Sequence, residues 1–184
     1  SSGTQTVKPS DRMESWNSPE FRDACKPPPP ALPEPGEQPA DAAAAEAAVR
    51  DSFDTIRAED IAARLEVIDD GTGIESAWAA IAAGQYAEAA AGATFTIRDF
   101  VFSSPTEAWF RYDIESSAGT FTDRYGRAVL GDNGAWLLTR DTVCQDLALA
   151  LAPCDPPGSA VLPPSAANDP RYGAVPFEGE APVA

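Results

Sequence analysis

The distribution of proline divides this chain into three parts. Of its 18 prolines, nine lie in residues 1–40 and eight in residues 153–184, whereas residues 41–152 contain only Pro105. Proline fixes φ and lacks a backbone N–H, so helix interiors and central strands exclude it. We therefore expect an irregular, Pro-rich N-terminal arm over residues 1–40, a folded domain over residues 41–156 and an irregular C-terminal tail over residues 157–184.

The chain is strongly acidic and contains no histidine. Its 184 residues include 13 Lys and Arg against 29 Asp and Glu, which gives a formal net charge of −16. This balance argues against nucleic-acid binding, because phosphate contacts need clustered basic side chains. The absence of histidine removes Ser-His-Asp and Cys-His catalysis and histidine metal ligation. No apolar run approaches the roughly 18–20 residues of a membrane helix. We predict no nucleic-acid partner, no membrane span, no metal and no cofactor.

The first residues of the sequence suggest a compartment. The chain begins Ser1-Ser2-Gly3, and its only methionine is Met13. Cleavage of a secretory signal peptide would leave such a beginning, and an expression-tag remnant is the alternative. We therefore predict a protein that is secreted or located at the cell surface.

The three cysteines, Cys25, Cys144 and Cys154, allow several pairings. In a secreted chain an odd count predicts one disulfide and one further thiol. A straight helix would separate Cys144 and Cys154 by about 15 Å, whereas a disulfide needs about 4.4–6.8 Å between α-carbons. A helix that breaks before Pro153 and folds back could close that pair. A bridge from Cys25 to either partner remains the alternative.

Hydrophobic periodicity predicts helices in the first half of the domain and strands in the second. Three helices are expected from apolar residues at a period of about 3.6, the first beginning at the acidic cap Asp41. Their apolar residues are Val49, Phe53 and Ile56, then Ile61, Leu65 and Ile68, and then Ile74, Trp78 and Ile81. A short helical turn is expected over residues 86–91. From residue 94 the period becomes 2.

Four strands and a last helix complete the predicted domain. The strands are expected over residues 94–102, 109–114, 120–130 and 135–139. Between the last two strands, Asn133-Gly134 favours a hairpin turn with positive φ at both of its central positions. A short helix is expected over residues 142–151. This order predicts an α+β fold, in which N-terminal helices pack on one face of a curved four-stranded antiparallel meander.

The order of these elements over residues 41–155 resembles the NTF2-like superfamily, whose members have a cystatin-like α+β cone. Within this superfamily, the chain looks like the secreted NTF2-like proteins of actinobacteria. The resemblance depends on the helix over residues 41–57, the Ala-rich segment 78–93, the strands 94–102 and 109–115, and Trp136-Leu137-Leu138 after the Asn-Gly turn. The ending from Arg140 through Cys154 looks like the cysteine-bounded ending of such proteins. The resemblance implies a pocket between helices and sheet, and some members of the superfamily are isomerases or dehydratases that resemble one another in using a pocket Asp with Tyr or His partners.

We name candidate pocket residues but predict no catalytic residue. The candidates are Trp78, Asp99, Trp109, Asp113 and Asp123, with Tyr112 and Tyr125 as donors and Arg98, Arg111 and Arg124 as counter-ions. A carboxylate base needs an apolar site and a partner within hydrogen-bond reach. The alternative interpretation is that the charged residues form cross-strand ion pairs on the solvent side and that the tryptophans belong to the core.

Two functions are compatible with the sequence. The first is a secreted, non-catalytic structural module, whose residues 1–40 and 157–184 dock onto neighbouring protein subunits of an extracellular or cell-surface assembly. The second is a small-molecule-binding protein or an isomerase/dehydratase-like enzyme that uses the pocket of the cone. The second function requires a cavity of several hundred Å³, whereas a cone filled with aromatic side chains would argue against it.

Overall fold

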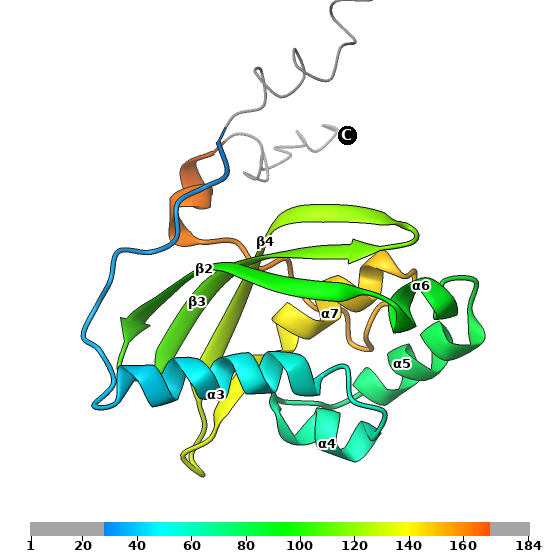
Figure 1. The fold of residues 1–184 in the computed structure, drawn as a ribbon, viewed down its shortest axis with the longest axis horizontal. Coiled ribbons are helices and arrows are strands. Elements are labelled where there is room, and N and C mark those ends of the chain that lie inside the picture. Colours follow the sequence, from blue (N-terminus) through cyan, green and yellow to red (C-terminus); the bar gives the residue numbers. More distant parts are fainter. Residues whose placement is uncertain (1–27, 170–184) are drawn as a thin grey trace, which may run out of the picture.

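The structure, a computed structural model, describes residues 28–169 and places helices before and after a curved sheet (Figure 1). The helices are α3 (Ala42–Thr55), α4 (Ile61–Glu66), α5 (Ile74–Ala83), α6 (Ala87–Ala91), α7 (Arg140–Leu149) and the 3₁₀-helix η1 (Pro164–Asn168). The strands are β1 (Ile68–Asp69), β2 (Thr94–Ser104), β3 (Glu107–Ser116), β4 (Gly119–Leu130) and β5 (Trp136–Thr139). The predicted α+β class is confirmed. Within residues 28–169, no helix is both long enough and apolar enough to cross a bilayer.

The sheet has five strands in the order β1-β5-β4-β3-β2 and is mixed. Strands β2 to β5 form consecutive antiparallel pairs, whereas β1 pairs with β5 in parallel, with Ile68 opposite Leu138. The prediction of four antiparallel strands is therefore incomplete. The sequence places Ile68 on a helix with Ile61 and Leu65, but α4 ends at Glu66. A strand of two residues is too short to show a period of its own.

The turn between β4 and β5 differs in detail from the prediction. The Gly134 amide donates to the carbonyl of Gly131 at 2.9 Å, and only Gly134 has a positive φ, of 78°. Asn133 keeps a negative φ, and its Oδ1 accepts a hydrogen bond from the amide of Ala135 at 3.0 Å. The predicted hairpin between β4 and β5 is therefore present, but Asn133 does not use the positive φ that this residue pair tolerates, because the turn is a type I turn followed by a left-handed glycine.

One face of the sheet, here called the inner face, packs against α3. Val49 and Phe53 on α3 are fully or almost fully buried, as the apolar period predicts. The Phe53 ring lies 5.2 Å from the ring of Phe110 and 4.9 Å from that of Tyr112. Such edge-to-face contacts add to the stabilisation from burial alone. The position of α3 on the inner face is therefore determined by this aromatic cluster.

Side chains of helix α7 form hydrogen bonds with the part of β4 that is not paired with β5. Strand β5 pairs only with residues 128–130 of β4. Beyond them, the Thr142 hydroxyl accepts from the Arg127 amide at 2.9 Å and donates to the Arg127 carbonyl at 3.1 Å. Gln145 Nε2 donates to the carbonyl of Tyr125 at 2.6 Å. Side chains of α7 thus satisfy backbone groups that would otherwise be unpaired.

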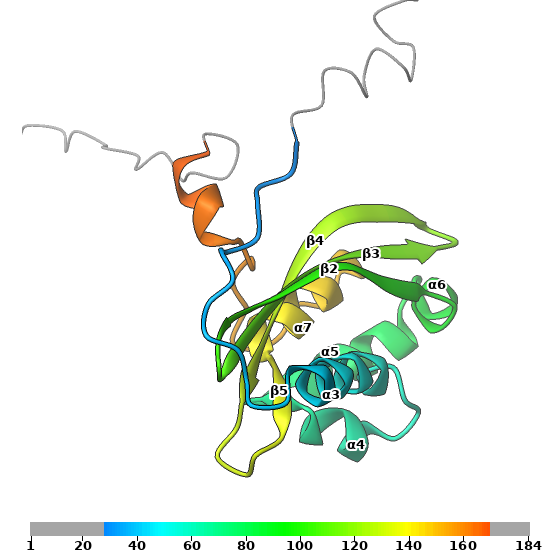
Figure 2. The same cartoon turned by 60° about the vertical axis from the view of Figure 1, so that its left-hand side comes forward.

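The opposite face of the sheet, here called the outer face, is covered in part by the described segments of the predicted arm and tail (Figure 2). Buried Trp109, Tyr125 and Val161 form an apolar cluster there, against which Leu32 packs. Leu32 of the arm and Val161 of the tail therefore pack on the protein's own sheet, and Ser165 donates a hydrogen bond from the tail to the arm. The other residues of both predicted flanks, Cys25 among them, lie outside the described residues.

Candidate functional site

A cavity of about 590 Å³ lies between the inner face of the sheet and helices α5 and α6. Its walls also include Ile56 and Arg57, which follow α3, and parts of α4 and α7. Figure 1 shows α6 close to the end of the sheet where β2 begins and β3 ends, so α3 covers one part of the inner face and α6 another. A cavity of the size expected for the ligand-binding hypothesis is therefore present.

The composition of α6 explains why this part of the inner face remains open. The helix has the sequence AEAAA, and its four alanines line the cavity. An alanine side chain cannot fill the volume that a leucine or phenylalanine would occupy in a close-packed core. The facing walls are mostly apolar, and their larger side chains are Trp78, Ile81, Phe95, Ile114, Phe121 and Leu147. The result is an apolar cavity with one small-residue wall.

Among residues 28–169, Asp146 of α7 is the only acidic residue that lines this cavity, and its side chain is only 10% exposed. Its Oδ2 accepts a hydrogen bond from the Tyr112 hydroxyl at 2.6 Å, and its Oδ1 accepts one from Arg124 Nε at 2.7 Å. Burial raises the pKa of Asp146 to about 6, although the Arg124 charge and both hydrogen bonds act in the opposite direction. The pKa of the Tyr112 hydroxyl is also raised, by burial and by the neighbouring carboxylate.

The arrangement around Asp146 favours anchoring over proton transfer. Each carboxylate oxygen already accepts a short hydrogen bond, and Gln145 Nε2 donates to the Tyr112 hydroxyl at 3.2 Å. A general base must instead reach a proton of the substrate. Among residues 28–169, no three acidic or cysteine side chains are grouped so that they could hold a metal ion.

The three predicted aspartates lie on the outer face, away from the cavity. Asp113 accepts hydrogen bonds from Arg98 Nε at 2.7 Å and from the amide of Asp123 at 3.0 Å. Arg111 pairs with Asp99, and its other terminal nitrogen lies 3.5 Å from Asp123. Successive residues of a strand point to opposite faces, so the buried Tyr112 on the inner face places its neighbours on the outer face. None of these three candidate acids lines the cavity, and each forms an ion pair, as the alternative interpretation describes.

The two predicted tryptophans are separated by the sheet. Trp78 lines the cavity, whereas Trp109 belongs to the outer cluster with Tyr125. The sequence analysis missed Asp146, although a signal was present. Asp146 lies three residues after Val143 and next to Leu147, on the apolar side of α7. A carboxylate within an apolar helical stripe could have identified it.

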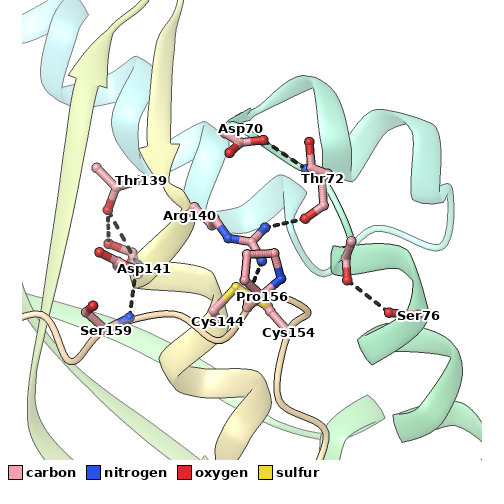
Figure 3. The surroundings of a disulfide bond; sticks show 12 residues. Asp70, Thr72, Ser76, Thr139, Arg140, Asp141, Cys144, Cys154, Pro156 and Ser159 are labelled. Atoms are coloured by element: carbon pink, nitrogen blue, oxygen red, sulfur yellow. Dashed lines mark hydrogen bonds between the residues drawn. A yellow bond between two sulfur atoms is a disulfide. The ribbon is translucent and has the colours of Figure 1, made fainter.

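Of the pairings considered for the three cysteines, the structure contains the disulfide between Cys144 on α7 and Cys154 (Figure 3). The two α-carbons lie 5.6 Å apart because the chain folds back after α7. Next to the disulfide, Arg140 donates to the carbonyls of Pro156 and Thr72. These contacts attach residues 154–156, the end of the domain, to the helix that forms one wall of the cavity.

Comparison with known proteins identifies a family. Residues 38–154 match the family described as low molecular weight antigen MTB12, C-terminal domain. No curated protein and no solved structure matches the chain. The resemblance to NTF2-like proteins thus stays a prediction. The matched residues contain the cavity, Asp146 and both cysteines of the disulfide, and they cover well over half of the sequence. The chain therefore belongs to the family of the C-terminal domain of low molecular weight antigen MTB12.

Proposed function

We propose that this protein is a non-catalytic, small-molecule-binding protein whose ligand occupies the cavity beneath α6. The observation that carries the proposal is the cavity itself, of about 590 Å³ and with mostly apolar walls. Ligand pockets typically have about 300–1,000 Å³ and combine apolar walls with a few polar groups. Asp146, held by Tyr112 and Arg124, is such a group, and its fixed position suits orientation of a ligand better than catalysis.

We also propose that the protein acts outside the cytoplasm, in secreted form or at the cell surface. The family name describes an antigen, which is in keeping with that location. The disulfide between Cys144 and Cys154 supports it, because such bonds persist in oxidising compartments.

The cavity can be tested with Nile red, an uncharged apolar dye whose fluorescence increases in apolar surroundings. We expect saturable binding of one dye per chain. The Ala90→Phe variant should weaken it about tenfold, because a ring introduced at this wall occupies the cavity. The matched control is Ala47→Phe, since Ala47 is an exposed alanine of α3 that does not line the cavity. Unsaturable binding, or equal affinity in both variants, would contradict the proposal.

Docking onto other subunits is a second candidate function. The observation that favours it is that the arm and the tail meet on the outer face, where the Ser165 hydroxyl donates to the carbonyl of Ala31. Residues 1–27 and 170–184 therefore extend from neighbouring parts of the described structure and could act together on one partner. Removing both segments should then abolish assembly, measured by sedimentation, while Nile red binding persists. Assembly that survives the truncation would count against docking.

A further inference from the structure

The charge at the cavity differs in sign from the charge of the protein as a whole. The chain carries a net charge of −16, yet its cavity is lined by two arginines, Arg57 and Arg64, and by one acid, Asp146. The charge of Asp146 is compensated by Arg124, whose Nε lies 2.7 Å from the carboxylate. The two arginines that line the cavity therefore give this part of an acidic protein a local positive charge.

Arg64 is the less compensated of these two arginines. It is half-buried, and within residues 28–169 it forms no ion pair with a carboxylate. Its Nε donates to the carbonyl of Ala58, and its guanidinium lies 5.0 Å from the ring centroid of Trp78. Burial lowers the pKa of Arg64, which shows that the charge is partly desolvated without a compensating anion. A guanidinium in this situation is available to an incoming acid.

Arg57, in the turn between α3 and α4, also lies over an aromatic ring. Its guanidinium lies 5.1 Å from the centroid of Phe95, another aromatic residue of the cavity wall. It pairs with Asp54, whose side chain is 69% exposed, so this pair is open to solvent and contributes little. A guanidinium has five N–H donors, and most of those of Arg57 remain for a ligand. Each arginine thus stacks on an aromatic residue that itself lines the apolar cavity.

We infer that the ligand is an amphipathic anion of the fatty-acid type, with its chain in the cavity and its carboxylate bound by Arg57 and Arg64. The apolar walls match the chain, and the guanidinium forks match the two oxygens of a carboxylate. The volume of about 590 Å³ suits a single chain. This inference rests on the proposed function and specifies its ligand.

The first experiment compares decanoate with 1-decanol on the full chain by calorimetry at about pH 8, where the carboxylate of decanoate is ionised. The two probes have the same chain and differ in the charge of the head. We expect decanoate to bind about tenfold more tightly, with an affinity that falls as salt is added. Equal affinities would overturn the inference and leave the proposed function intact. Binding of neither probe would overturn both.

Substitutions then test the two arginines. Arg64→Gln should weaken decanoate binding about tenfold and leave decanol binding unchanged, and Arg64→Lys should retain part of the preference. The matched control is Arg50→Gln, because Arg50 also lies over a ring, that of Phe100, but does not line the cavity. An equal loss for both probes in Arg64→Gln, or an equal loss in Arg50→Gln, would contradict the inference.

A substitution that should raise the decanoate affinity gives a result that unfolding of the variant cannot produce. Asp54→Asn removes the exposed carboxylate beside Arg57 without removing an arginine. Decanoate affinity should then rise about two- to threefold, because one competing anion is gone, while decanol affinity stays constant. An unchanged or lower decanoate affinity would count against a role for Arg57.

Discussion

Different segments pack on the two faces of the sheet, and this difference determines where a ligand can bind. On the outer face, the flanking segments close over Trp109 and Tyr125, and the Tyr125 hydroxyl donates to the carbonyl of Pro30 at 2.7 Å. On the inner face, α3 covers one part with Phe53, whereas α6 offers only short alanine side chains to the rest. Apolar strands therefore become a packed core or a cavity according to the side chains of the segment that covers them.

The two faces also differ in the direction in which they shift the pKa of a carboxylate. Asp146 on the inner side is removed from water and has a raised pKa. Asp113 on the outer face is also partly desolvated, but hydrogen bonds from Arg98 and from the Asp123 amide prevail and lower its pKa. The outer face thus favours the ionised form of its acid, whereas the inner face opposes it.

The largest expected effect comes from a matched pair of tryptophans, one at the cavity and one on the outer face. Trp78 is 8% exposed and Trp109 is 9% exposed, so Trp→Ala removes a similar buried area from each site. Each change should lower the free energy of unfolding by about 3–5 kcal/mol. Only Trp78→Ala, which enlarges the cavity, should alter Nile red affinity, and Trp109→Ala should leave it within about twofold.

Denaturant titration measures the stability of both variants, and dye titration measures their binding. The assignment of ligand binding to the inner side would be overturned if Trp109→Ala changed dye affinity as much as Trp78→Ala. A small loss of stability in Trp109→Ala would show instead that the flanking segments pack only weakly on the outer face.

The main helices and strands could be predicted because their apolar residues recur regularly over many residues. Val49, Phe53 and Ile56 mark one face of α3, and the alternation in β3 separates Trp109 from Phe110. Strand β1 could not be predicted in this way. Its two residues are a strand only because the backbone of β5 lies beside them, which is a property of the folded chain.

The candidate site was harder to predict, because a sequence does not show which partner a buried charge will find. The sequence analysis grouped Tyr112 and Arg124 with the acids of the strands, whereas both donate to Asp146 on α7. Arg124 is separated from Asp146 by 22 positions. The cavity itself depends on what is missing from α6, and local alanine content does not reveal the volume that it leaves.

The second prediction compares the two faces by the pH dependence of stability, with Asp146 on the inner side and Asp113 on the outer face. The folded-state pKa of Asp146 is about 6 and its ordinary value is 3.8, so the folded state binds the proton more tightly than the unfolded state. The contribution of Asp146 to the free energy of unfolding is therefore largest at low pH. This contribution is lost as the pH rises from about 4 to about 6. The free energy of unfolding of the native protein, measured relative to that of Asp146→Asn, should fall by roughly 2–3 kcal/mol as the pH rises across that interval.

Asp113→Asn provides the comparison from the outer face. The pKa of Asp113 is lowered, so its contribution is present above the ordinary value of 3.8 and is lost as the pH falls below it. The two variants should therefore change the pH dependence of unfolding with opposite signs, measured by urea titration between about pH 3 and pH 7. The same sign in both would contradict the assigned difference between the faces.

The smallest expected effect concerns the hydrogen bond that closes the outer face. Tyr125→Phe removes the hydroxyl that donates to the carbonyl of Pro30 and leaves that buried acceptor without this donor. The free energy of unfolding should fall by about 1–2 kcal/mol, and the Gly36 amide, which donates to the carbonyl of Phe102, should exchange hydrogen faster. Tyr86→Phe is the matched control on the inner side, because Tyr86 lines the cavity and its hydroxyl makes no hydrogen bond within residues 28–169. If Tyr125→Phe left both stability and exchange unchanged, the Tyr125 hydroxyl would contribute nothing to holding the arm, and the arm would be held on the sheet by the apolar packing of Leu32 and by the hydrogen bond from the Gly36 amide to the Phe102 carbonyl.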